Sequence, residues 1–158
     1  MPVVDLLDLP AALPPNTPVL GLDLGEKTIG VATSDVSRSI ASPLELIRKT
    51  KFSDDAARLF KLMDGRKAQG LVIGLPVNMD GTEGPRCQSA RAFARNLFRF
   101  RDPVIAFWDE RMSSMAINRM LIGEADLTRA KRADVVDRAA AAYILQGALD
   151  RLKGEGLA

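Results

Sequence analysis

The chain has 158 residues and a mass of 17.1 kDa, which is room for about one domain. Hydrophobic residues make up 47% and charged residues 27% of it, and the mean hydropathy of +0.01 is that of an ordinary globular protein. Apolar runs stay well below the ~18 residues that a membrane span needs, and the N-terminus lacks the basic start of a secretory signal. We therefore expect neither a transmembrane protein nor a signal peptide.

The sequence contains no histidine and one cysteine, Cys87. These counts exclude Ser-His and Cys-His catalytic pairs, histidine metal ligands, an internal disulfide framework and zinc sites with several cysteines. A catalyst built from this chain must use carboxylates, lysine, arginine, hydroxyl groups or a bound metal ion. The net charge of +2 is too small to identify a partner, so the distribution of charge matters more than its sum.

The first half of the chain predicts an extension followed by three strands. Residues 1–16 contain four of the nine prolines and are expected to be loose. Residues 19–24 and 28–33 are apolar runs separated by a short glycine-containing turn, which predicts a β-hairpin. Residues 43–47 alternate in polarity and predict a third short strand.

The second half predicts alternating helices and strands. The expected elements are a helix over 53–67, a strand over 70–75, a loop over 76–84, a helix over 85–101, a strand over 103–108, and helices over 113–122 and 133–152. Ser53 is the expected N-cap of the first of these helices, and Ala57, Phe60 and Leu62 are among its apolar positions. The order predicts one α/β domain over residues 17–152, a mixed five-stranded sheet flanked by helices, with a tail over 153–158.

Asp23 interrupts an apolar strand that is expected to be central in the sheet. A carboxylate there is costly unless it is paired or binds a cation. The glycines at positions 21, 25 and 30 leave backbone space beside it for a phosphate or metal ion. The alternative is an aspartate at a strand end that caps the following turn, and the spacing alone does not decide between the two.

Two further acidic positions are candidates for the same site. Asp109 and Glu110 directly follow a predicted strand, where ligands gather in open α/β sheets, although a solvated loop or a helix cap would explain them equally. Only one of this adjacent pair is expected to face a site. Asp137 could be a first-turn acid with Asp134 as the N-cap, but on a helical wheel it shares the small-residue face of the last helix.

Three carboxylates on separate elements predict a converging cluster. Oxygen ligands of this kind suit hard cations, so Mg²⁺ (or Mn²⁺) is the expected cofactor. Such ions activate water and stabilise the leaving oxygen in phosphodiester hydrolysis, a mechanism that needs no histidine.

Two basic clusters flank these acids. Five arginines and no acid lie between residues 86 and 101, and Arg91, Arg95 and Arg99 recur every four residues. The second cluster comprises Lys131 and Arg132 together with Arg129 and Arg138. Either cluster could be a solvated helix face, but together they favour a nucleic-acid backbone as the partner.

Four segments in order resemble the YqgF/RuvX family. They are Gly21 to Ala32 (GLDLGEKTIGVA), Gly74 to Glu83 (GLPVNMDGTE), Asp109 to Ser114 (DERMSS) and Asp137 to Gln146 (DRAAAAYILQ). The first alone is unspecific, because sugar kinases and actin-like ATPases begin similarly. The set is highly specific, and it covers about residues 18–150.

This resemblance implies a ribonuclease H-like fold and a pre-16S rRNA nuclease of the bacterial cytoplasm. It also implies that Asp23, Glu110 and Asp137 are the metal-binding carboxylates. Further residues implied at the substrate site are Lys27, Asn78, Asp80, Gly81 and Arg111. The family does not require residues 1–16, so their role is open.

The leading hypothesis is thus a Mg²⁺-dependent endonuclease on structured RNA, with Arg91, Arg95, Lys131 and Arg132 also holding its backbone. One alternative is the same chemistry on four-way DNA junctions, as a Holliday junction resolvase. Another is a ribosome-assembly factor that binds nucleic acid without cleaving it. A kinase-like nucleotide-binding protein would need a second domain, for which the chain is too short. The sequence leaves both a monomer and a homodimer open.

Overall fold

The computed structural model describes residues 3–112 and 129–157, with side chains from residue 139 onward in the second range. It contains a five-stranded sheet in the order β3-β2-β1-β4-β5. The strands are β1 (Val19–Leu24), β2 (Thr28–Ser34), β3 (Ala41–Arg48), β4 (Gly70–Leu75) and β5 (Val104–Asp109). The α-helices of the described part are α1 (Phe52–Arg66), α2 (Pro85–Leu97) and α4 (Arg129–Gly154). Short 3-10 helices are η1 (Leu6–Asp8), η2 (Pro10–Ala12) and η3 (Glu110–Met112).

The sheet is mixed, as the sequence predicts. Strands β1, β2 and β3 form an antiparallel meander, whereas β4 pairs in parallel with β1 and β5 pairs in parallel with β4. Three parallel strands therefore end at the same edge of the sheet. Ligands of open α/β sheets bind at such an edge, so it is the first place to look for a site.

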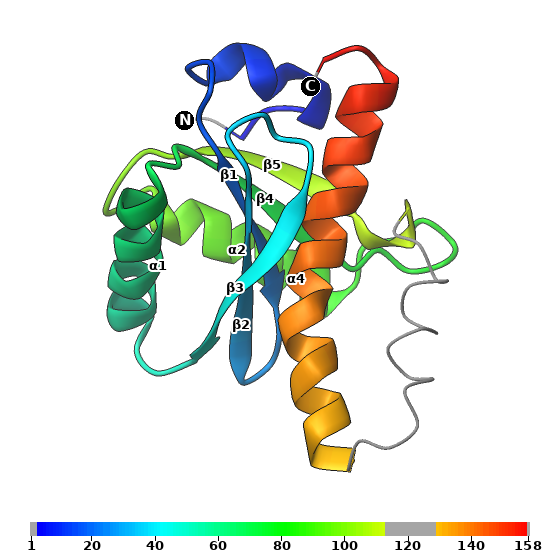
Figure 1. The fold of residues 1–158 in the computed structure, drawn as a ribbon. Helices are drawn as coiled ribbons and strands as arrows, with labels where there is room; N and C mark the ends of the chain where they lie inside the picture. Colours follow the sequence, from blue (N-terminus) through cyan, green and yellow to red (C-terminus); the bar gives the residue numbers. More distant parts are fainter. Residues whose placement is uncertain (1–2, 113–128, 158) are drawn as a thin grey trace.

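Helices cover both faces of the sheet (Figure 1), with α4 crossing one face and α1 and α2 lying on the other. Alternation along β1 sorts its side chains between the two layers. Leu20 and Leu22 belong to the core beneath α1 and α2, while Val19 belongs to the core beneath α4. Asp23 shares the parity of Val19, which puts it on the α4 face.

Glycines let α4 lie unusually close to the sheet. A Cβ atom added to Gly21 would be 2.6 Å from the Leu145 Cβ, and one added to Gly74 would be 2.5 Å from the Ile144 Cδ1. A side chain at Gly21 would push against the Leu145 Cβ and the Ala141 carbonyl of the helix, and one at Gly74 would displace the Ile144 side chain. The two glycines thus fix how closely the helix that carries Asp137 approaches the strands beside Asp23.

The expectation that residues 1–16 are loose is wrong for the described part of that segment. Val3 bridges to Ile105 on the edge strand β5, and the Val4 amide donates to the Ile105 carbonyl at 2.8 Å. Leu9 and Leu13 are buried in the core beneath α4. Prolines indicate a break in regular structure, but they do not prevent apolar side chains between them from docking.

Helix α1 differs from its prediction in both its start and its buried face. It begins at Phe52, so Ser53 lies inside the helix and Lys51 occupies the N-cap position. Ala57 is exposed and Leu62 half-buried, while Phe60 is buried as expected. The full buried set of the helix is Asp55, Ala56, Leu59, Phe60 and Met63.

The remaining helix boundaries also shift. Helix α2 ends at Leu97, four residues before the predicted end, and α4 begins at Arg129. Asp134 therefore lies within α4 and is not its N-cap. Helix α4 runs to Gly154, two residues into the predicted tail. The predicted helix over 113–122 lies outside the described residues, and no helix among those described is long and apolar enough to span a membrane.

Candidate active site at the carboxyl ends of β1, β4 and β5

Asp23 and Glu110 meet at the edge where the three parallel strands end. Asp23 is the fifth residue of β1, and Glu110 directly follows β5. Gly74, on β4 between them, has no side chain, and a Cβ there would lie 3.3 Å from the Glu110 carboxyl carbon. The bare backbone at this position lets Glu110 reach across the end of β4 toward Asp23.

The pKa of Glu110 is raised from its ordinary value of 4.5 to about 6. Burial is the largest cause, the negative charge of Asp23 is the next, and Asp109 adds a smaller contribution. The positive charge of Arg86 acts in the opposite direction. Two partly buried carboxylates that repel each other form a pair that a cation would stabilise.

Asp109 and Glu110 point to different partners. The Asp109 carboxylate accepts hydrogen bonds from the Arg111 side chain, the shortest at 2.7 Å, and from the Arg111 backbone amide at 2.9 Å. These bonds lower the pKa of Asp109. Asp109 is thus bound by Arg111, while Glu110 is the member of the pair whose pKa is raised by the charge of Asp23.

The loop over residues 76–84 folds on itself beside Arg111. Asn78 donates its side-chain amide to the Thr82 hydroxyl at 3.1 Å, and that hydroxyl donates to Asp80 at 2.6 Å. Gly81 has φ +89°, and a Cβ added there would lie 3.8 Å from the Arg111 guanidinium. The hydrogen bonds from Thr82 lower the pKa of Asp80, and the charge of Arg111 adds a smaller effect in the same direction. Asn78, Asp80 and Gly81 therefore shape a turn against η3, and Asn78 itself bonds within that turn.

The basic residues expected at the substrate site have different environments. Lys27 is exposed in the β1–β2 turn, and Arg95 is exposed on α2. Arg91 forms an ion pair with Glu83 at 2.7 Å and lies over the Phe107 ring at 5.0 Å from its centre. Its guanidinium holds the 76–84 loop to α2.

Three expected site residues lie outside the described side chains. Asp137, Lys131 and Arg132 all fall on the first part of α4, of which the structure describes the backbone. Asp137 precedes the buried Ala141 by four residues, about one helical turn. The convergence of the third acid thus stays a prediction from the helical wheel.

Arg86 lies beside the candidate site, and the sequence patterns did not single it out. It is the second residue of α2, is exposed, and lies close enough to Glu110 to affect its pKa. It also lines a groove of about 570 Å³ between the β1–β2 turn and α2. Gly84 and Pro85 mark the start of a helix directly after the loop over residues 76–84. The position of Arg86 at that helix start could have indicated that it lies near the loop.

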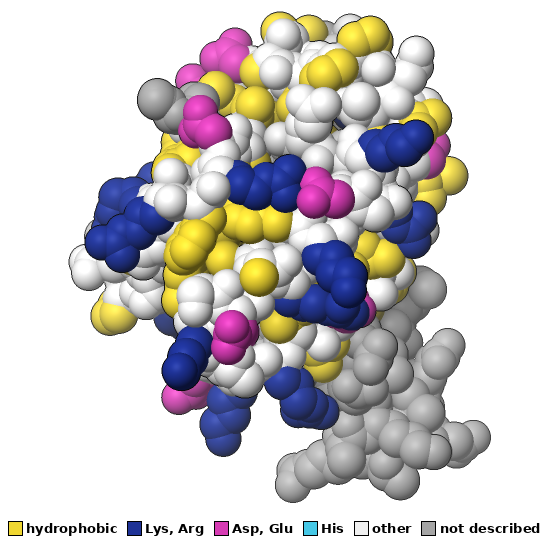
Figure 2. All heavy atoms as spheres, turned by 90° about the vertical axis from the view of Figure 1, so that its left-hand side faces the viewer, with side chains coloured by type: hydrophobic (Ala, Val, Ile, Leu, Met, Phe, Trp, Pro, Cys, Tyr) yellow, Lys and Arg dark blue, Asp and Glu magenta, His cyan; other side chains and the backbone are white. Residues whose placement is uncertain are grey.

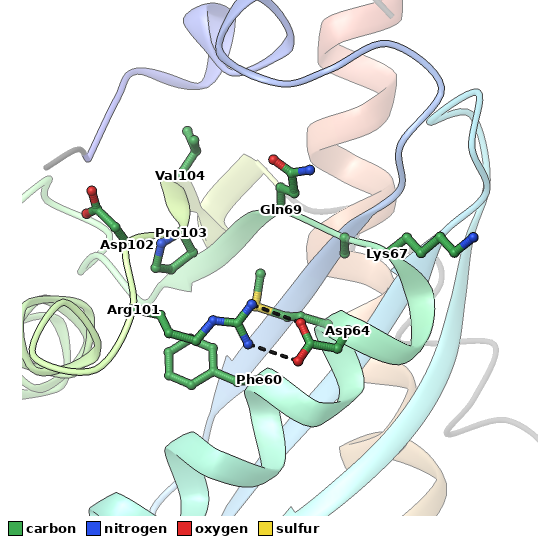
Figure 3. Close-up of a pocket in the computed structure, with 10 residues that line it drawn as sticks. Phe60, Asp64, Lys67, Gln69, Arg101, Asp102, Pro103 and Val104 are labelled. Atoms are coloured by element: carbon green, nitrogen blue, oxygen red, sulfur yellow. Dashed lines mark hydrogen bonds and ion pairs between the residues drawn. The ribbon is translucent and has the colours of Figure 1, made fainter.

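A second hollow of similar size lies at the opposite end of the sheet, where β5 begins (Figure 3). Its lining includes Phe60, Gln69 and Pro103, and the Arg101–Asp64 ion pair of 2.8 Å crosses it. None of the candidate site residues lines it. The described candidate site residues therefore lie away from this hollow, and the two carboxylates Asp23 and Glu110 are at the carboxyl ends of the parallel strands.

The described side chains supply two of the three carboxylate ligands expected for a hard cation. Asp23 and Glu110 supply carboxylate oxygens, which Mg²⁺ and Mn²⁺ prefer. Among the residues whose placement is described, no group of three or more acidic or thiol side chains is close enough to hold one ion. A complete set of three acids would need Asp137.

Comparisons with known proteins identify the family of this chain. The family model described as "RuvX: Holliday junction resolvase" matches residues 17–151. A protein of Phenylobacterium zucineum (strain HLK1), named "Putative pre-16S rRNA nuclease", is 76% identical over 97% of this chain and 99% of its own length. A protein of the same name from Rhodospirillum rubrum is 64% identical over 96% and 94%.

Solved structures agree on the fold. RuvC of T. thermophilus, solved with a Holliday junction substrate, superposes with a TM-score of 0.52 at 13% identity, covering 89% of this chain and 97% of RuvC. The yeast mitochondrial Holliday junction resolvase Ydc2 gives a TM-score of 0.50 at 15% identity, covering 94% and 86%. The expected fold, a mixed five-stranded sheet flanked by helices as in RuvC-type resolvases, is confirmed.

Proposed function

Since the chain belongs to the RuvX family, we propose that it is a metal-dependent endonuclease that hydrolyses phosphodiester bonds in the precursor of 16S rRNA. The observation that carries the proposal is the pair of carboxylates, Asp23 and Glu110, at the carboxyl ends of parallel strands. Burial and the charge of Asp23 both raise the pKa of Glu110, and a cation bound beside the two carboxylates would favour their ionised forms. The name shared by relatives up to 76% identical supports the choice of substrate.

Asp23, Glu110 and Asp137 would hold Mg²⁺ or Mn²⁺. A bound ion of this kind supplies a nucleophilic water at neutral pH and charge stabilisation for the leaving oxygen. We assign the second ligand to Glu110 because the Asp109 carboxylate is engaged by Arg111.

The chain's own cations would place the substrate backbone. Arg86 adds positive charge beside Glu110, which favours a phosphate next to the carboxylates despite their negative charge. Lys27 in the β1–β2 turn and Arg95 on α2 are exposed and would add further contacts to the backbone. Arg111 is held by Asp109 and lies beside the loop over residues 76–84, where its charge acts on Asp80.

The test is cleavage of a 16S rRNA precursor fragment and of a synthetic four-way DNA junction, each with Mg²⁺ and with EDTA. Wild-type protein should cut the RNA only with Mg²⁺, and Asp23→Asn should abolish cutting while keeping the fold and RNA binding. Asp54→Asn, at an exposed acid on α1, is the matched control and should cut normally.

Each other outcome points to a different function. Selective cutting of the junction would favour the activity in the family's description, DNA junction resolution. Binding of RNA without cutting of either substrate would favour a ribosome-assembly factor. Cleavage retained by Asp23→Asn would refute the assignment of the active site.

A further inference from the structure

A groove lies between the β1–β2 turn and α2, next to the carboxylates. Its described lining is Leu24, Gly25, Glu26, Lys49, Arg86, Ser89 and Phe93. The volume of about 570 Å³ is within the ~300–1,000 Å³ typical of small-ligand sites. A space of this size can accept one nucleotide.

One face of α2 builds one side of the groove. Arg86, Ser89 and Phe93 follow each other at helical spacing, so all three side chains are presented along the same line. Phe93 is almost fully buried and packs edge-on against Phe52, with ring centres 5.4 Å apart. The helix therefore offers a fixed surface that is basic at its start, polar in the middle and apolar further along.

The hairpin and the residue after β3 build the other side. The Lys49 amide donates to the Lys27 carbonyl at 2.9 Å, which ties Lys49 to the β1–β2 turn. Leu24, at the end of β1, adds an apolar side chain on the face opposite Asp23. The groove thus begins on one side of a strand end whose other side carries the first catalytic acid.

The charges of the groove favour an anion. Lys49 and Arg86 outnumber the single acid of the described lining, Glu26. Within the described part of the chain, neither cation takes part in an ion pair, whereas Arg58, Arg91, Arg101 and Arg111 all do. Basic side chains also gather along the lower edge of the face in Figure 2, at the level of the β1–β2 turn in Figure 1.

We propose that this groove binds one unpaired nucleotide of the substrate strand flanking the scissile phosphate. Lys49 and Arg86 contact its phosphates, and the base enters between Leu24 and Phe93. A base still paired to a partner strand could not enter a space enclosed on both sides by protein. The inference rests on the proposed nuclease function and adds to it a preference for a locally unpaired strand.

The experiment measures binding of a fluorescent ten-nucleotide oligouridylate in EDTA, where no cleavage occurs. Counterion release predicts that losing two single-strand phosphate contacts lowers the salt slope by about 1.4 and the affinity about 25-fold at 0.1 M salt. The double variant Lys49→Gln/Arg86→Gln should show both changes. Lys61→Gln/Arg66→Gln, with the same charge change on an exposed part of α1, is the matched control.

A second pair of variants tests the groove without changing charge. Ser89→Trp would fill the groove and should reduce affinity for the oligouridylate to the level of a blunt duplex. Gln88→Trp, at the neighbouring exposed position outside the groove, should bind like wild type. The proposed contacts are to phosphates and to the face of the base, so an oligothymidylate should bind the wild-type protein as tightly as the oligouridylate does, and much weaker binding would contradict these contacts.

The outcomes separate this inference from the proposed function. If groove variants bind like their controls while the wild-type protein cuts RNA, the groove assignment is overturned and the nuclease stands. If the groove variants lose binding but the wild-type protein cuts nothing, the groove stands and the nuclease falls. Equal wild-type affinity for duplex and single strand would also overturn the groove assignment.

Discussion

Neutralising Glu110 should make the metal-free protein more stable, although the residue belongs to the active site. In the folded chain the Glu110 carboxylate is half-buried and repelled by Asp23, so its pKa is about 6 against an ordinary 4.5. Because folding raises the pKa, the folded chain binds this proton more tightly than the unfolded chain does, so the protonated form of Glu110 is the more stable one in the fold. Glu110→Gln imitates that neutral form at every pH.

The magnitude follows from the size of the shift. A difference of 1.5 between the two pKa values corresponds to about 2 kcal/mol, and solvent screening of a half-buried group reduces this to about 1 kcal/mol. Below pH 4.5 Glu110 is protonated in both states, so variant and wild type should be equally stable. As the pH rises through 6 the wild type loses the contribution, and the variant keeps its advantage above that.

Thermal unfolding in EDTA at pH 4 and pH 8 measures this effect. We expect the Tm of Glu110→Gln to exceed that of wild type by about 2–4 °C at pH 8 and to match it at pH 4. Glu26→Gln makes the same change of charge at an exposed acid in the β1–β2 turn and is the matched control. Mg²⁺ should then stabilise wild type more than Glu110→Gln. If the variant is less stable than wild type at pH 8, the ionised Glu110 carboxylate is not destabilised by its burial and by Asp23, and the reasoning is refuted.

Two further substitutions test the packing that positions the site. Gly21→Ala puts a Cβ 2.6 Å from that of Leu145 and should lower the free energy of unfolding, measured in urea, by about 1–3 kcal/mol. Gly65→Ala, where a Cβ meets nothing within 4 Å, should raise it by about 0.5–1 kcal/mol. Equal effects of the two substitutions would contradict the close approach of α4. Leu9→Ala should cost about 2–5 kcal/mol in the same assay because the side chain is buried, and a loss below about 1 kcal/mol would mean that the N-terminal segment is not docked.

The sequence predicted the strands and the site edge well because both depend on local patterns. Apolar runs, and alternating polarity in the third strand, identified all five strands, and the order of the elements located the strand ends where Asp23 and Glu110 lie. It could not predict partners that come from distant segments. The spacing of Arg91 suggested a free basic stripe, yet Glu83 on the preceding loop pairs with it. Leu9 lies in a proline-rich segment, and it is buried because it packs into the core that α4 forms with the sheet, which is built from segments distant in the sequence.

Which of the two adjacent acids faces the site also depended on a contact beyond the pattern. Asp109 and Glu110 are equivalent by spacing, and the difference arises because the backbone turns into η3 after β5. That turn brings the Arg111 amide and side chain onto Asp109. A hydrogen bond between residues two apart is local, but it requires a backbone conformation that residue types alone do not specify.

The docked N-terminal segment has a consequence for association between copies of the chain. A sheet edge with unpaired amides and carbonyls can template pairing with another molecule. Val3 and Val4 occupy part of the β5 edge, and at the other edge β3 carries Pro43, which has no amide hydrogen to donate. Trimming the first residues to obtain a minimal domain would therefore uncover a hydrogen-bonding edge as well as a patch of core. Such a shortened protein should self-associate and precipitate at concentrations that the full chain tolerates.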